Sequence, residues 1–256
     1  MSATLEAMAR AIFKDWFVDF GPTRAKQEGR APYLAPDIWS LFPDALDDEE
    51  KPDGWKAGKV ADIVHFNPSE ILRKGYPAPY LDMAALPTQG ATPDNPIQRE
   101  FTSGMKFRNG DTLLARITPC LENGKTAFAQ CLDNDAVGWG STEFIVMRAV
   151  PPVPKPYSYL LARDPPFRRH AIQSMTGTSG RQRARTEAVA EYPLAMPRND
   201  ALWTVLGNII DPLFQRIAAN ADESNTLAAT RDFLLPKLMS GEVRVKDAEK
   251  LIGEVK

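Results

Sequence analysis

The sequence has few cysteines and histidines, which limits the disulfides and metal sites that it can form. Its 256 residues include only Cys120 and Cys131, and only His65 and His170. Two cysteines cannot form a disulfide framework, and with these histidines they show no zinc-ligand spacing. We therefore expect reduced thiols, no metal site and a cytoplasmic protein.

Long uncharged apolar runs are also missing. No run approaches the roughly 18 residues of a membrane-spanning helix, and the start shows no secretory pattern. Hydrophobic residues make up 43% of the chain and charged residues 25%, as in ordinary globular proteins. The sequence thus predicts no membrane partner.

Familiar catalytic motifs are absent, with one exception. Asp164-Pro165-Pro166-Phe167 matches the (Asn/Asp)-Pro-Pro-(Tyr/Phe) motif of DNA amino-methyltransferases, in which the ring stacks on a flipped base. The glycine loop that would hold a methyl donor has no counterpart in this sequence. The alternative is a proline-marked break between two helices, with no catalytic role.

Both ends of the chain have helical apolar periodicity. The residues spaced to pair one helix with another are Leu5, Ile12, Trp16, Leu206, Ile210, Leu213, Ile217, Leu227 and Leu234. The 37 residues from Leu202 to Leu238 would extend about 55 Å as a helix. Pro212 predicts a restart there, capped by Asp211, and Pro236 a kink. Thr4–Phe17 also resembles Thr226–Met239 in sequence.

We therefore predict an α+β protein in which an N-terminal helix and a long C-terminal helix form an antiparallel coiled-coil spacer around one mixed domain. The alternative is two ordinary amphipathic helices on one core. The expected boundaries are a helix over 1–20, a linker over 21–52, a domain over 53–200, a helix over 201–240 and a tail over 241–256. Strands are expected at Lys59–Phe66, Tyr80–Leu86, Thr112–Ile117, Thr126–Cys131 and Thr142–Val150. Residues 87–104 resemble a polar loop, and a helical pattern follows Pro156.

Positive charge is concentrated locally although the net charge is −2. Six arginines fall between Arg163 and Arg185, against the single acid Asp164. Such clusters can contact phosphates, while Arg and Gln can bind base edges. The candidates for DNA contact are Lys106, Arg108, Arg116, Thr118, Asn123, Lys125, Arg181, Gln182, Arg183 and Arg185. The alternatives are a solvated arginine-rich surface and a structural Arg116–Glu122 ion pair.

Four stretches, taken in order, resemble the DNA-specificity subunits of type I restriction–modification systems. They are Leu5–Gly29, Gly110–Phe128 with Gly138–Arg148, Phe167–Arg185, and Thr226–Val245. The resemblance implies target-recognition domains that are held apart by antiparallel conserved helices, each domain recognising one half of a bipartite DNA site. It also implies docking of the methylation subunits, and through the complex of the restriction subunit. S-adenosylmethionine, Mg and ATP would then bind to those partners, and this chain would have no cofactor.

The sequence departs from this family in having one recognition domain, so that it resembles the second half of a full subunit. It could be a fragment, a truncated product, or a half-subunit that pairs with a second copy of itself. Three functions are therefore weighed: a non-catalytic DNA-recognition subunit, a small DNA adenine amino-methyltransferase using Asp164–Phe167, and an assembly-only module.

Overall fold

Two four-stranded sheets form the centre of the structure, a computed structural model that describes residues 1–133, 135–178 and 180–243. The chain divides into two units, residues 1–217 and 218–256. In the first sheet every neighbouring pair is antiparallel, and the order is β2 (Val64–Phe66), β9 (Phe144–Ala149), β6 (Thr112–Ala115), β7 (Thr126–Phe128). The second sheet is mixed, because β3 and β8 run parallel, and its order is β4 (Ile97–Glu100), β3 (Pro77–Leu81), β8 (Gly138–Gly140), β5 (Met105–Phe107). A separate antiparallel pair joins β1 (Lys56–Lys59) to β10 (Pro193–Met196).

The two sheets share an apolar core. Leu81 and Phe107 of the second sheet pack with Phe144 and Val146 of the first, and each is at most 1% exposed. Alternate residues of a strand point to opposite faces, so the other face of each sheet needs its own cover. Helix α4 (Pro156–Arg163) supplies that cover for the first sheet, where Tyr159 packs near Phe128.

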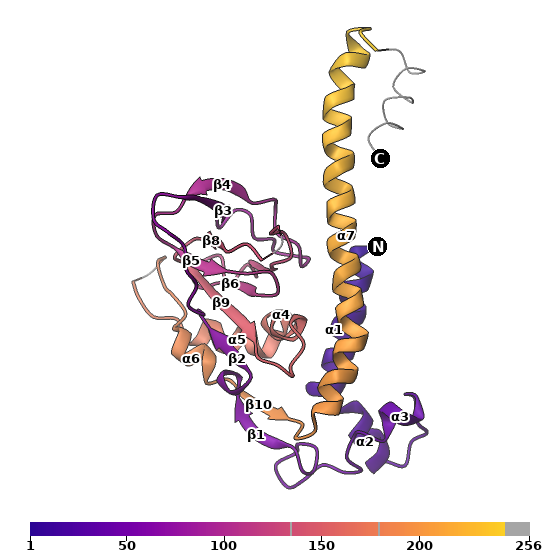
Figure 1. The fold of residues 1–256 in the computed structure, drawn as a ribbon. Helices are drawn as coiled ribbons and strands as arrows, with labels where there is room; N and C mark the ends of the chain where they lie inside the picture. The colour runs from indigo at the N-terminus through magenta and orange to yellow at the C-terminus, as the bar shows by residue number, and fades with distance from the viewer. Residues whose placement is uncertain (134, 179, 244–256) are drawn as a thin grey trace. The chain divides into compact units, whose positions relative to one another are not determined.

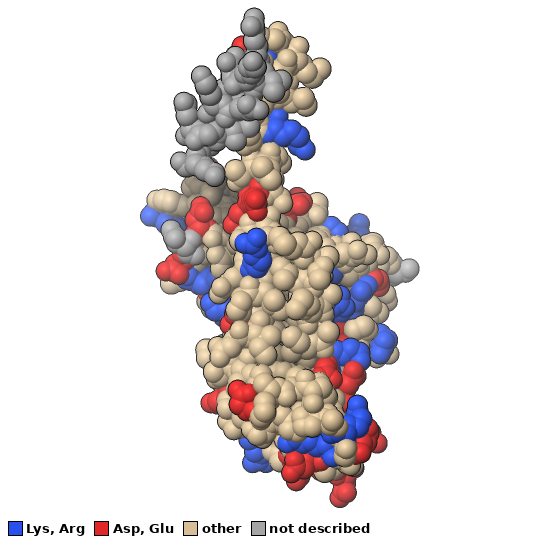
Figure 2. Space-filling model, turned by 90° about the vertical axis from the view of Figure 1, so that its right-hand side faces the viewer, with Lys and Arg blue, Asp and Glu red and all other residues tan. Residues whose placement is uncertain are grey.

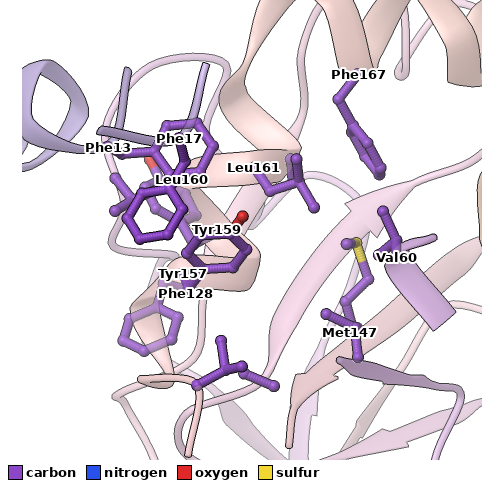
Figure 3. Close-up of a cluster of buried hydrophobic side chains, with 14 of the residues drawn as sticks. Phe13, Phe17, Val60, Phe128, Met147, Tyr157, Tyr159, Leu160, Leu161 and Phe167 are labelled. Atoms are coloured by element: carbon purple, nitrogen blue, oxygen red, sulfur yellow. The ribbon is translucent and has the colours of Figure 1, made fainter. Parts of the chain in front are cut away.

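The buried cluster on this side extends to the N-terminal helix. In Figure 3, Phe13 and Phe17 lie against Tyr157, with ring centroids 5.2 and 5.4 Å from the tyrosine ring. Helix α5 (Pro165–Gln173) follows α4 after Asp164, as the predicted proline-marked break requires. The short helices η1 (Val60–Asp62) and α6 (Thr186–Ala190) complete this region.

The terminal helices are α1 (Ser2–Phe17) and α7 (Asp200–Met239). In Figure 1, α1 runs antiparallel beside the first part of α7, and Phe17 stacks on Trp203 with ring centroids 4.9 Å apart. Residues Leu206, Ile210 and Ile217 are buried in the same core as the sheet residues. This half of α7 therefore follows the alternative of an amphipathic helix on a common core. The fold class is confirmed, whereas a coiled-coil spacer stays a prediction.

The remainder of α7, from residue 218 onward, belongs to the second unit. Leu227, Phe233 and Leu235 are exposed there by 63%, 57% and 51%, whereas Leu234 is 8% exposed. The helix continues through Pro212 and Pro236, so the predicted restart at Pro212 was wrong. Most of the predicted tail, residues 244–256, lies outside the described residues.

The segment expected to be a linker with one short helical turn at Pro36–Phe42 contains that turn as α3 (Pro36–Trp39), but also α2 (Gly21–Gln27), which was not predicted. Phe42 packs edge-on against Trp16. Lys26 Nζ also donates to the Phe42 carbonyl over 2.6 Å. Trp16, selected for helix pairing, thus contacts this segment.

The strand predictions were incomplete. The expected segments contain or overlap β1, β2, β3, β6, β7 and β9, whereas β4 lies inside the expected polar loop and β5, β8 and β10 were not predicted. Within the described ranges, no helix has both the length and the apolar character needed to cross a bilayer.

Candidate nucleic-acid interface

Two polar stretches that lie about 60 residues apart in sequence meet in the structure. We call residues 116–125, 176–178 and 180–185 together the loop junction. An isolated bridge pairs Ile117 with Arg183, and Thr118 N donates to the Gln182 carbonyl over 3.0 Å. Ala184 N donates to the Arg116 carbonyl over 2.8 Å. Backbone hydrogen bonds therefore fix the two stretches against each other.

The turn over Pro119–Gly124 presents Asn123 to solvent. Asn123 N donates to the Pro119 carbonyl over 2.9 Å, and Gly124 has φ +79°, which favours glycine. A Cβ at Gly124 would lie 2.9 Å from the Arg168 guanidinium. Arg168 itself donates to the carbonyls of Leu121 and Glu122. The turn is thus clamped by α5, and its exposed tip is positioned by backbone contacts.

Arg163 holds the other side of this turn. Its guanidinium donates to the carbonyls of Gly124 and Thr126 over 2.8 Å each, and to that of Thr88 over 2.8 Å. Its Nε donates to the buried Tyr159 hydroxyl over 2.9 Å. Arg163 and Arg168, two members of the sequence cluster, therefore support the fold of the junction.

Several of the predicted contact residues also have structural partners. Arg183 forms a two-pronged ion pair with Glu143, at 2.9 and 2.7 Å, and this hydrogen bonding raises the pKa of Arg183. Lys125 Nζ donates to the Met83 carbonyl over 2.7 Å. No sequence pattern pointed to Glu143, which lies 40 residues before its partner.

Arg116 and Thr118 lie deeper in the junction. Thr118 Oγ1 donates to Glu122 Oε1 over 3.0 Å, whereas Arg116 Nε is buried with no hydrogen-bond partner. Glu122 Oε2 is likewise buried without one. Among the described residues no ion pair joins Arg116 to Glu122, so that alternative was wrong.

Arg181, Gln182 and Arg185 differ from these residues because their side chains are exposed. Neither Arg181 nor Arg185 forms an ion pair with any residue that the structure describes. Arg181 and Arg185 therefore give the junction two positive charges without a paired acid among the described residues, and Gln182 and Asn123 give it two amide groups. Such groups can bind phosphates and base edges.

Lys106 and Arg108 lie outside the two stretches of the loop junction, and their side chains contact Glu70. They are at and just after β5 of the second sheet, where Lys106 Nζ donates to the Glu70 carbonyl over 2.6 Å. Arg108 Nε lies 2.8 Å from a Glu70 carboxylate oxygen. Burial alone would raise the pKa of Glu70, but hydrogen bonds from Arg148 and Arg108 hold it below its usual value. No hydrogen bond or strand pairing links these two cations to the loop junction in the described ranges.

The methyltransferase alternative requires an accessible aromatic ring. Phe167 is 0% exposed and packs edge-on against Tyr192, with centroids 5.2 Å apart, so it cannot stack on a flipped base. Asp164 is 6% exposed, and burial raises the pKa of its carboxyl group. The described residues contain no group of three or more His, Cys, Asp or Glu side chains that could hold a metal ion.

The face that Figure 2 turns to the viewer has little charge in its middle. Its Lys, Arg, Asp and Glu side chains lie mainly along the margins and at one end of a broad uncharged area. This is the side on which α1 and the first part of α7 lie in Figure 1. Among the exposed residues of α7 between residues 202 and 217, Thr204, Asn208, Pro212 and Gln215 are uncharged and Arg216 is charged.

The sequence is similar to curated specificity subunits of type I restriction enzymes. The EcoEI and EcoAI subunits of Escherichia coli are 28% and 27% identical to it, over 71% and 72% of this chain. The MjaIX subunit of Methanocaldococcus jannaschii is 23% identical over 95% of the chain. The chain spans about a third of the two E. coli relatives (32% and 34%) and 54% of the third.

A solved structure, the S subunit of a type I restriction-modification system from M. genitalium, aligns with a TM-score of 0.49 and 14% identity. The alignment covers 91% of this chain and 56% of that one. No family model matches the sequence. The predicted resemblance is therefore confirmed by the sequence relatives.

Proposed function

Because the chain is similar in sequence to the specificity subunits of type I restriction enzymes, we propose that it is the non-catalytic DNA-recognition subunit of such a complex. In this proposal the domain formed around the two sheets recognises one half of a bipartite DNA site. The methylation subunits supply the methyl-transfer chemistry, and the restriction subunit joins through the complex.

The observation that carries the proposal is the loop junction. It combines Arg181 and Arg185, which form no ion pair with a described residue, with the amide side chains of Asn123 and Gln182. Phosphate contacts from arginine position a protein on DNA, while paired hydrogen bonds to base edges provide specificity. The backbone bonds that join both halves of the junction reduce the entropy lost when these side chains bind.

The partners follow from the same proposal. The uncharged face over α1 and the first part of α7 is suited to docking another protein, because an interface core is depleted in charge. We assign it to a methylation subunit. S-adenosylmethionine, Mg and ATP would then bind to partner subunits, and this chain would work in the cytoplasm without a cofactor of its own.

A second copy of the chain is a further partner under this proposal. The chain spans about a third to a half of its relatives' length, and a full recognition unit would need two domains. Two copies related by a twofold axis would recognise a palindromic site. The exposed apolar residues Leu227, Phe233 and Leu235 are candidates for that contact.

Methylome mapping tests the proposal directly. The chain is expressed with its methylation partner in a host that lacks other adenine methylation. We expect one methylated bipartite or palindromic motif that disappears when the chain is omitted. Methylation that persists without the chain would refute recognition by it, and methylation by the chain alone would favour the methyltransferase alternative.

The loop junction is tested with the double variant Arg181→Ala/Arg185→Ala in the assembled complex. We expect at least tenfold weaker binding to the mapped site, with a salt slope reduced by about 0.9 per lost phosphate contact. Arg198→Ala, an exposed arginine outside the junction, is the matched control. Complex formation without any DNA selectivity in the unmodified chain would instead favour the assembly-only module.

A further inference from the structure

The outer face of the second sheet carries a layer of aromatic residues beneath cations. Tyr80, Phe101 and Trp139 belong to a small cluster separate from the core between the sheets. Tyr80 lies 4.4 Å from Trp139 between ring centroids, and Phe101 packs edge-on against Trp139 at 5.4 Å. The rings are therefore fixed relative to one another.

Each part of this layer supports a positively charged group. The Arg99 guanidinium lies 4.8 Å from the Tyr80 centroid and 5.8 Å from that of Trp139. Lys106 Nζ lies 5.3 Å from the Phe101 centroid. Just outside the layer, the Arg73 guanidinium lies 4.4 Å above the Tyr76 ring. Attraction between a cation and a ring face limits the freedom of these long side chains.

The charges of Arg73 and Arg99 are not cancelled. Neither forms an ion pair with a residue that the structure describes, and both side chains are exposed. The nearest acid in sequence to Arg73, Glu70, is already paired with Arg108 and Arg148. Arg73 and Arg99 therefore give this face a local positive excess, as Arg181 and Arg185 do at the loop junction.

Exposed apolar side chains border these cations. Ile71 is 92% exposed, Ile97 61% and Tyr76 51%, and these are among the most exposed large apolar residues of the first unit. Ile97 and Arg99 lie on β4, which is an edge strand of the sheet with all four residues exposed. Uncancelled arginines beside exposed apolar groups match the charged phosphates and apolar sugars of a nucleic-acid backbone.

We propose that this face, defined by Ile71, Arg73, Lys74, Tyr76, Ile97 and Arg99, is a second DNA-binding surface that holds the phosphodiester backbone. We call it the β4 surface. It rests on the proposed function, because it serves the same DNA as the loop junction. Its role is to add affinity through phosphate contacts, which position a protein on DNA without selecting its sequence.

The test uses the full chain and a labelled random-sequence duplex of about 30 base pairs, measured by fluorescence anisotropy between about 50 and 200 mM KCl. Arg73→Ala/Arg99→Ala is expected to weaken binding about tenfold at the lower salt. The slope of log K against log [KCl] is expected to fall by about 1.8, or about 0.9 for each of two phosphate contacts. Arg198→Ala is the matched control and is expected to bind like the unmodified chain.

A second variant distinguishes loss of positive charge from loss of folding. Arg73→Lys/Arg99→Lys keeps both charges and is expected to retain most of the salt slope, and circular dichroism checks that each variant is folded. An alanine variant that is folded and binds with unchanged affinity and slope would overturn the β4 surface. The same result accompanied by loss of a protein partner would assign this edge strand to protein docking, which also overturns it.

The two proposals fail in different ways. If the unmodified chain, alone and in its complex, binds neither the random duplex nor the mapped site, the proposed function fails and the β4 surface fails with it. If the unmodified chain binds and only the loop-junction variant loses selectivity while the β4 variant is unchanged, the proposed function stands and the β4 surface is refuted.

Discussion

The two halves of α7 have similar apolar spacing but different surroundings. From Leu202 to Ile217 the large apolar side chains are buried in the core of the first unit or packed against it, and Trp203 is 3% exposed. From residue 218 onward Leu227 and Phe233 are more than half exposed. Periodicity predicts that a helix has an apolar face, but it does not say whether the same chain covers that face.

The largest expected difference between the halves is in stability. Trp203→Ala removes a ring that stacks on Phe17 and meets Tyr157 edge-on at 5.1 Å. We expect a loss of about 3–5 kcal/mol in the free energy of unfolding, because a buried ring leaves a cavity. Phe233→Ala, at a 57% exposed position, is expected to change it by about 0.5 kcal/mol or less. Urea unfolding measures both, and equal losses would contradict the comparison.

The arginines also differ in their surroundings. Arg163 is hydrogen-bonded to backbone carbonyls, whereas Arg181 is exposed. Arg163→Ala leaves the carbonyls of Thr88, Gly124 and Thr126 without their donor. We expect a loss of about 2–4 kcal/mol, because the bonds to Gly124 and Thr126 are partly buried and acceptors removed from water are costly to leave unpaired. Arg181→Ala is expected to leave stability within about 0.5 kcal/mol while weakening DNA binding. Thermal unfolding measures the stability of both variants, and anisotropy measures their DNA binding. An Arg163→Ala variant as stable as the unmodified chain would contradict the supporting role of Arg163.

A smaller change in stability but a clear change in assembly is expected at Leu227. Leu227→Glu places a charge on an exposed apolar position of the second unit. We expect unfolding to stay within about 0.5 kcal/mol of the unmodified chain, while association with a partner helix weakens. Sedimentation of the chain, alone and with the methylation subunit, measures this association. Unchanged assembly would remove Leu227 from any helix interface.

The smallest expected effect is a pH dependence that differs between two aspartates of α7. Burial raises the pKa of Asp211, with Lys155 opposing the shift, whereas a hydrogen bond from Arg231 lowers the pKa of Asp232. Because the folded pKa of Asp211 exceeds its unfolded value, its favourable contribution is present at low pH and lost as pH rises through the folded pKa. Asp211→Asn is therefore expected to raise Tm slightly at neutral pH, and this gain should vanish toward pH 3.

Asp232 gives the matched control for that experiment. Its lowered pKa makes a contribution of the opposite sign, present above the unfolded pKa and lost on acidification. The Arg231–Asp232 pair is solvent-exposed and therefore weak. Asp232→Asn is expected to leave the Tm at neutral pH nearly unchanged. A gain in Tm equal to that of Asp211→Asn would show that burial of Asp211 has no influence.

Only part of the arrangement of the cationic residues could be predicted from the sequence. The family resemblance pointed to both stretches of the loop junction, and side-chain chemistry selected the candidates within them, but neither predicted the backbone bond between Thr118 and Gln182. Nor could they separate Arg183, which pairs with Glu143, from Arg181, which does not. The β4 surface was missed because Arg73 and Arg99 stand in short polar segments without a strong strand pattern.

The α+β class, the two terminal amphipathic helices, the break at Asp164 and the family resemblance could be predicted from the residues alone, since these depend on local composition and order. Which apolar residues are covered and which cations are paired became known from the folded structure. Those outcomes depend on contacts between distant segments, such as Phe17 with Trp203 and Arg163 with Gly124. Local propensity carries no information about such partners, because the free energy of a side chain is set by what surrounds it in space.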